Sequence, residues 1–222
     1  SGEIGEHYGM DVFETFCGQG FTVFAVYAGS FTRFNLLDMH DFVRTAIRWI
    51  KGHADEYRIA PDRIGITGIS AGACLAAYAA VAPQEPKPRE PYGEHDTRIA
   101  AAAVFCPPTD FTLYGTDSFT AVFMGGLFFR SGITDKSEEL ILTRGRKVSP
   151  LYQVSEDDPP FLIFHGTEDD TVPFEHAKKL TAALEEHDVS VELVVKEGAG
   201  HGWSNREDDV ALMPAWFAER LR

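Results

Sequence analysis

Cysteine is scarce in this chain of 222 residues, which has three, Cys17, Cys74 and Cys106. An odd number of cysteines cannot pair completely within one chain. Each of the three lies in an apolar stretch, so we expect small buried side chains rather than disulfides. The chain has no CxxC pair, and its histidines show no metal-ligand spacing. We therefore expect neither a metal nor an organic cofactor.

Basic residues are also few: 20 Lys and Arg stand against 34 Asp and Glu, a formal net charge of -14. Such an acidic surface repels phosphate backbones, which argues against a nucleic-acid partner. No run of about 18 apolar residues occurs, so no membrane-spanning helix is expected, and no signal peptide is recognisable at the start. The hydrophobic share of 44% is that of a soluble globular chain, whose length suits one domain. Composition assigns neither a compartment nor an oligomeric state.

Five short apolar segments have the composition of buried parallel strands. Each is rich in Val, Ile or Phe and is bounded by Gly, Pro or Asp. They cover residues 21–27, 63–69, 99–106, 160–165 and 190–196. Helical patterns lie between them. Apolar residues recur every three or four positions from Met39 to Ile50, with Asn35 as the N-cap. Pro173 and Pro214 are each placed to begin a further helix. This alternation predicts an α/β fold with a mostly parallel sheet and helices on both of its faces.

Residues 107–159 interrupt the alternation, because they are longer than an ordinary connection. They contain an apolar, aromatic segment at 119–129 and a charged helical segment at 136–146. We expect a lid-like insert within a single domain that covers residues 1–222.

The predicted strand at 63–69 runs directly into Gly68-Ile69-Ser70-Ala71-Gly72, and an Ala-rich helical segment follows. This is the G-x-S-x-G pattern in a strand–turn–helix context, which exposes a nucleophilic serine on a sharp turn. Small neighbours are required there, and the two glycines meet that need. The pattern predicts Ser70 as a nucleophile, with the backbone N–H of Ala71 directed at a developing oxyanion. A helix-capping serine is the alternative.

A nucleophilic serine needs a base, and the base needs a carboxylate that orients it. In this topology the chain order is Ser, then Asp or Glu, then His, with each partner in a loop after a strand. His201 has Gly on both sides in the loop after strand 190–196, so we predict it as the base. His165 closes its strand, and we expect it to orient the following turn through hydrogen bonds.

Three adjacent carboxylates, Glu168, Asp169 and Asp170, follow strand 160–165. A tight turn after Gly166 can direct only one of them at His201. We predict Asp169 as the orienting acid and keep Asp170 in reserve.

These motifs, at residues 68–72, 165–173 and 198–203, resemble those of the α/β-hydrolase superfamily. Residues 38–72 are similar to the helix-to-elbow segment of carboxylesterases and prolyl-oligopeptidase-like serine hydrolases. Within that group the chain looks closest to bacterial esterases related to those that remove acetyl or feruloyl groups from plant polysaccharides. The resemblance implies an α/β-hydrolase fold and an esterase with Ser70, Asp169 and His201 as its triad.

The chain departs from that pattern at its start. Relatives carry a strand ending in a Gly-rich loop, which supplies the second oxyanion donor, and no such strand precedes Ser1. The N-terminal strands are therefore apparently missing, and the donor is assigned to the N–H of Gly2 or Glu3. The absent strand lies between 21–27 and 63–69 in relatives. Those two strands are expected to pair directly, to leave a gap, or to be joined by another chain. Relatives also often have an acidic residue in place of Ile69.

Candidate pocket residues are Ile69, Phe123, Phe128 and Trp203, although aromatic residues of the insert can equally pack it onto the domain. The favoured function is a serine hydrolase that cleaves small-molecule carboxylic esters through an acyl-enzyme, including acetyl or feruloyl esters of plant polysaccharides. The alternatives are a prolyl-oligopeptidase-like peptidase and a non-catalytic binding protein with a hydrolase fold.

Overall fold

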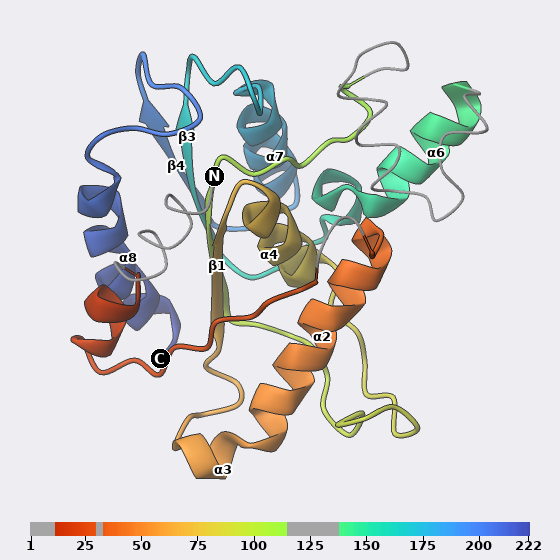
Figure 1. Cartoon of the computed structure of the whole chain (residues 1–222), viewed down its shortest axis with the longest axis vertical. Coiled ribbons are helices and arrows are strands. Elements are labelled where there is room, and N and C mark those ends of the chain that lie inside the picture. Colours follow the sequence, from red (N-terminus) through yellow and green to blue (C-terminus); the bar gives the residue numbers. More distant parts are fainter. Residues whose placement is uncertain (1–11, 30–32, 115–137) are drawn as a thin grey trace.

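The computed structural model describes residues 12–29, 33–114 and 138–222 (Figure 1). Four strands form one parallel sheet in the order β1-β2-β3-β4. They are β1 (Gly65–Ile69), β2 (Ala101–Phe105), β3 (Phe161–Gly166) and β4 (Val191–Lys196). Four of the five predicted strands are thus confirmed, as is the α/β fold class. Because the strands are parallel, their carboxyl ends lie at one edge of the sheet, which collects the loops that follow them.

Helices cover both faces of the sheet, as Figure 1 shows. On one face lie α2 (Leu36–Gly52), α4 (Ala71–Val81) and α7 (Glu175–Glu186). The helical residues 12–17 and α8 (Arg206–Arg220) pack on the other face. β2 and β3 are therefore buried on both sides, which explains why their sequences are apolar apart from His165. The short α3 (Ala54–Tyr57) follows α2 at the opposite end of the sheet from the strands' carboxyl ends.

Local signals account well for the start of α2. The Asn35 side chain accepts a hydrogen bond from the Asp38 N–H at 2.9 Å, and the Asp38 carboxylate accepts one from the Asn35 N–H at 3.2 Å. This reciprocal pair is a capping box, which satisfies amides that the first turn of a helix leaves free. The predicted N-cap is confirmed.

The prediction that Pro214 begins a helix is wrong, because Pro214 lies inside α8, which begins at Arg206. Three acidic residues, Glu207, Asp208 and Asp209, occupy the first turn and complement the helix dipole. Proline disfavours a helix interior locally. Burial of Met213 and of the other apolar residues of α8 against the sheet outweighs that preference.

The predicted strand at residues 21–27 is also wrong, since this segment has no regular secondary structure. A cavity of about 270 Å³ lies between it and β1, lined by residues of both segments and of α2 and α4. β1 pairs only with β2 in the described sheet, and its residues are half-buried where those of β2 are buried. Apolar composition is a local property, whereas a strand needs a neighbour for its backbone hydrogen bonds. Direct pairing of residues 21–27 with β1, one of the three expected arrangements, is therefore not observed.

Part of the predicted insert is described. α6 (Glu138–Val148) matches the helical segment expected at 136–146, and a 3-10 helix, η1 (Pro150–Gln153), follows it. Phe111 and Val148 are buried in the core beneath α4 and α7, so the ends of the insert pack onto the domain. The aromatic segment at 119–129 lies outside the described residues.

The expected burial of the cysteines holds for two of them. Cys74 and Cys106 are free and buried, whereas Cys17 is free and exposed. In the helical residues 12–17, Val12 and Phe16 face the core at a four-residue spacing, so Cys17 falls on the outer side. Among the described residues, no helix has the length and apolarity needed to cross a membrane.

Candidate active site

Ser70 lies between the end of β1 and the start of α4, on the sharp turn that the sequence predicts. Its backbone has φ 53° and ψ -120°, a region that costs a residue with a side chain about 1–3 kcal/mol. The turn brings Gly68 against α4 so closely that a Cβ there would lie 2.4 Å from the Gly72 carbonyl oxygen. Gly68 is therefore required, because any side chain would push the turn open. The strain is held by the packed strand before it and the buried helix after it.

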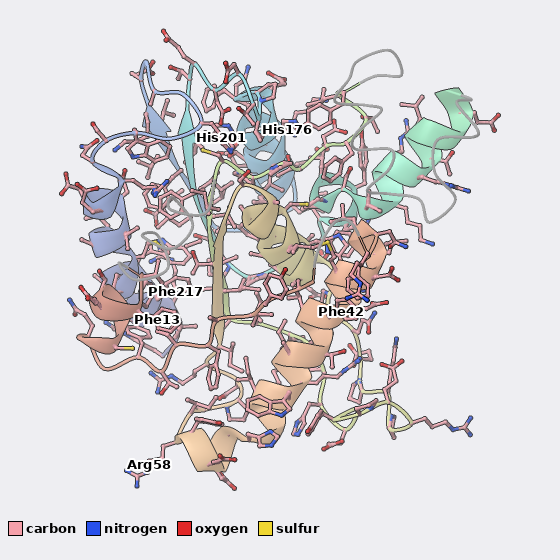
Figure 2. The ribbon with its side chains drawn as sticks, in the orientation of Figure 1. Phe13, Phe42, Arg58, His176, His201 and Phe217 are labelled. Carbon is pink, nitrogen blue, oxygen red and sulfur yellow. The ribbon has the colours of Figure 1, made fainter. Side chains whose placement is uncertain are left out.

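Two loops bring His201 and Asp169 to Ser70. His201 Nε2 lies 2.9 Å from Ser70 Oγ, and His201 Nδ1 lies 2.8 Å from Asp169 Oδ2. Because Nδ1 faces a carboxylate, it carries the ring proton, and the lone pair of Nε2 is left facing the Ser70 hydroxyl. His201 thus lies within hydrogen-bonding distance of both of the other residues predicted as a triad. Figure 2 labels His201 at the sheet edge where the strands end, with Arg58 at the opposite end of the molecule.

Asp169 is fixed by its own turn. Its Oδ1 accepts hydrogen bonds from the N–H groups of Thr171 at 3.0 Å and Val172 at 2.8 Å. Burial alone would raise the pKa of this carboxyl. Hydrogen bonds from His165, His201 and the Val172 amide more than offset that effect and hold the pKa of Asp169 below its ordinary value. The carboxylate is therefore charged at neutral pH, although its side chain is 0% exposed.

The neighbouring carboxylates are turned away. Glu168 and Asp170 are exposed, and Asp170 accepts a hydrogen bond from the Thr171 hydroxyl at 3.3 Å. Of the three adjacent acids, the structure brings Asp169 to His201. The His201 side chain is 28% exposed, so the histidine is reached from solvent while its carboxylate partner is not.

The other predicted site residues have mixed outcomes. Ala71 is the first residue of α4, where helical N–H groups have no partner within the helix. Ile69 ends β1 and packs on the α8 side of the sheet. Trp203 packs on the same side, and its indole N–H donates to Asp209 Oδ2 at 2.6 Å, which ties the His201 loop to α8. The predicted oxyanion donors Gly2 and Glu3 and the predicted pocket residues Phe123 and Phe128 lie outside the described residues.

Two contacts at the site were not part of the sequence prediction. His165 Nε2 lies 3.3 Å from Asp169 Oδ2, so a second histidine contacts the carboxylate. The thiol of Cys106, just after β2, lies 3.7 Å from the His201 carbonyl oxygen. Both His165 and Cys106 lie at the carboxyl end of a predicted strand, and this position in the sequence could have indicated that they are near the site.

One group of residues has donor atoms near enough to hold a metal ion. In the described part of the chain these are Cys106, His165 and Asp169, whose donor atoms lie within 4.8 Å of one another. Burial raises the pKa of Cys106 to about 12, which keeps it a thiol, and the other two residues are engaged in hydrogen bonds. The group therefore suits a hydrogen-bonded core better than a metal site.

A parallel sheet with helices on both faces, a serine on a strand-to-helix turn, and Asp and His in loops after the next strands define the α/β-hydrolase fold. Sequence comparison gives the family within that fold. The BD-FAE family matches residues 3–184, and the chain belongs to it.

Individual relatives and solved structures agree with this assignment. The chain is 34% identical over 136 residues to the probable carboxylic ester hydrolase LipM of Mycobacterium tuberculosis, a match that covers 61% of this chain and 31% of LipM. The chain thus spans about a third of that curated relative. It is similar to the esterase Est2 of Thermogutta terrifontis, with 30% identity, a TM-score of 0.61, and coverage of 83% of this chain and 63% of that one.

A truncated form of a carbohydrate esterase from gut microbiota has the same fold, with a TM-score of 0.78 at 22% identity. That match covers 95% of this chain and 78% of the other.

Proposed function

We propose that this chain is a carboxylic-ester hydrolase that works through an acyl-enzyme, with Ser70 as nucleophile, His201 as general base and acid, and Asp169 as the orienting carboxylate. The observation that carries the proposal is the continuous set of contacts from Ser70 Oγ through His201 to Asp169, at 2.9 and 2.8 Å. Its family and its esterase relatives support the same reaction class.

The proposed reaction follows from these contacts. Ser70 Oγ attacks the ester carbonyl carbon while His201 Nε2 takes the hydroxyl proton. The bond between the carbonyl carbon and the alcohol oxygen then breaks, and His201 returns the proton to the leaving alcohol. A water molecule, deprotonated by the same nitrogen, attacks the acyl-enzyme and releases the carboxylic acid and free Ser70. Asp169 keeps the proton on Nδ1 and stabilises the imidazolium that forms between these steps.

The oxyanion of each tetrahedral intermediate needs backbone donors. We assign one to the N–H of Ala71, because it follows the nucleophile and begins a helix. The second is assigned to Gly2 or Glu3. Loss of one such donor typically costs about 10²- to 10³-fold in turnover.

The proposed substrate is a small ester whose acyl group is short or aromatic, with acetyl and feruloyl esters of carbohydrates as the first candidates. The similarity to a gut carbohydrate esterase supports the carbohydrate part of this proposal. A formal net charge of -14 disfavours polyanionic substrates.

The first experiment is hydrolysis of p-nitrophenyl esters from acetate to octanoate, and of methyl ferulate. Ser70→Ala lowers kcat/KM by about 10⁶-fold if the serine is the nucleophile, while the melting temperature stays near that of the parent protein. Labelling of Ser70 by a fluorophosphonate probe checks the same point without a substrate. A folded chain that neither labels nor hydrolyses any ester would instead favour a binding protein.

A matched pair of variants tests whether Asp169 or Asp170 is the orienting acid. Asp169→Asn lowers kcat by about 10⁴-fold, because an amide no longer favours the required tautomer of His201. Asp170→Asn leaves the rate nearly unchanged, because the exposed Asp170 side chain does not contact His201. Equal losses in the two variants would contradict the assignment.

A further inference from the structure

His165 occupies an unusual position for a polar side chain. It lies in β3 with its side chain 0% exposed, packed in the interior of the domain. Its Nε2 faces two acceptors, the Val172 carbonyl oxygen at 2.8 Å and Asp169 Oδ2 at 3.3 Å. Its Nδ1 is buried and has no hydrogen-bond partner among the described residues. The ring proton is therefore on Nε2, where it is shared between the two oxygens.

A role in packing alone does not explain this arrangement. An apolar ring would fill the same space without burying the unpartnered Nδ1. What the histidine adds is one N–H at the point where the turn after β3 meets the carboxylate of Asp169. The turn is held from both sides, because Val172 donates its N–H to Asp169 Oδ1 and accepts from His165 through its carbonyl oxygen.

The hydrogen bonds to Asp169 divide evenly between its two oxygens. Oδ1 accepts two backbone N–H groups, from Thr171 and Val172. Oδ2 lies against His201 Nδ1 at 2.8 Å and His165 Nε2 at 3.3 Å. Without the His165 donor, Oδ2 would lose one of its two histidine contacts, and the turn would lose the bond at the Val172 carbonyl.

The other ionisable groups near His165 are uncharged at neutral pH. Cys106 is a thiol, since burial raises its pKa to about 12. His176 of α7 is neutral, since burial lowers its pKa to about 4. Asp169 is therefore the charged carboxylate of this buried group, and His165 is the second histidine side chain, after His201, that contacts it.

We propose that His165 is a positioning residue for ester hydrolysis: its Nε2–H holds the Asp169 carboxylate and the Val172 carbonyl, and thereby directs Asp169 Oδ2 at His201. This inference rests on the proposed function of Ser70, Asp169 and His201. His165 acts through its contacts with Asp169 and Val172.

The test compares His165→Phe, which keeps a ring and removes the donor, with His165→Gln, which can place an amide N–H where Nε2 lies. His165→Phe lowers kcat by about 10- to 100-fold with little change in KM, the size of effect that a displacement of about 1 Å at a catalytic group produces. The acid limb of the pH–rate profile moves to lower pH, because a carboxylate displaced from Nδ1 stabilises the His201 imidazolium less. In His165→Gln, kcat and the pH–rate profile are expected to return most of the way to those of the parent protein.

A second readout does not depend on activity. The downfield ¹H NMR signal of the His201 Nδ1 proton reports its hydrogen bond to Asp169. It shifts or broadens in His165→Phe and returns in His165→Gln. If His165→Phe does not fold, His165→Asn replaces it, because its shorter amide does not reach Asp169.

The matched control is His40→Phe, since His40 is also a buried histidine but stacks on Tyr78 away from the site. The control keeps the kcat, pH profile and proton signal of the parent. A folded His165→Phe that does the same overturns the positioning role, while loss of activity in Ser70→Ala would still support the proposed function. Parent protein that shows the Nδ1 signal but no turnover overturns the proposed function instead.

Discussion

Substitution of Gly166 by Ala should move the proposed catalytic residues apart, because the added methyl group has no room beside the His201 loop. Gly166 ends β3, beside the loop that carries His201. A Cβ at Gly166 would lie 2.2 Å from the Ala199 carbonyl oxygen and 2.5 Å from that of Gly200. Both obstacles are backbone atoms, so no side-chain rotation relieves them. In Gly166→Ala, the loop must move away from β3.

The size of the movement follows from these distances. Cβ atoms do not approach other atoms closer than 3.0 Å, so the Ala199 carbonyl must retreat by at least 0.8 Å from its present 2.2 Å. His201 follows two residues later, and its contacts with Asp169 and Ser70 are now 2.8 and 2.9 Å. A displacement of this size lengthens at least one of them to about 3.6 Å, beyond hydrogen-bonding range. We expect kcat/KM to fall by about 10²-fold and stability to fall by about 1–3 kcal/mol.

The assay is p-nitrophenyl acetate hydrolysis, with urea unfolding to measure stability. The matched control is Gly202→Ala in the same loop, because a Cβ at Gly202 meets no atom within 4 Å and φ is not positive there. That variant should retain activity within about threefold and stability within about 0.5 kcal/mol of the parent. If folded Gly166→Ala were as active as Gly202→Ala, the coupling between β3 and the His201 loop would be refuted.

Two further predictions concern stability and the edge of the sheet. Burial, and then the charge of Arg44, lowers the pKa of His40 to about 3. As the pH falls below the ordinary value of about 6.5, the unfolded chain therefore binds a proton first, and stability is lost by up to about 1.4 kcal/mol per pH unit. His40→Phe should flatten the decline in urea-unfolding free energy between pH 6.5 and 4, and an unchanged slope would contradict this.

Among the described residues, β1 has a strand partner on the β2 side alone. The Ser70 N–H donates to β2, so strand alternation turns the amides of Gly65 and Thr67 toward the cavity and those of Ile66 and Gly68 toward β2. Native-state hydrogen exchange measured by NMR should be at least about tenfold faster at the first pair than at the second. Equal protection of the two pairs would mean that the edge of β1 is paired.

The chain's local patterns predicted much of the site because each depends on neighbours in sequence. The turn at Ser70 needs small residues at fixed offsets, and Gly68 and Gly72 supply them. The capping box at the start of α2 is likewise formed by residues three apart. The predicted parallel strands place the loops carrying Asp169 and His201 at the same edge of the sheet. The order of these loops along the chain was therefore enough to predict that Ser70, Asp169 and His201 lie near one another.

Other features were decided by tertiary contacts. Residues 21–27 have a strand's composition, but backbone pairing needs a neighbour, and a cavity lies where that neighbour would be. Pro214 disfavours a helix by its own chemistry, yet the apolar face of α8 buries against the sheet and overrides it. Cys17 lies outside because one helical turn presents one face to the core.

The sequence by itself determined the kinds of residues at the site and their order along the chain, since these rest on local geometry and on the parallel arrangement of strands. Which of three adjacent acids faces His201, and that His165 holds it, depended on the tertiary structure. Asp169 and His201 lie 32 residues apart, and their 2.8 Å contact depends on how the loops after β3 and β4 pack against each other. No local propensity encodes such distances, and only the packing of the whole domain fixes them.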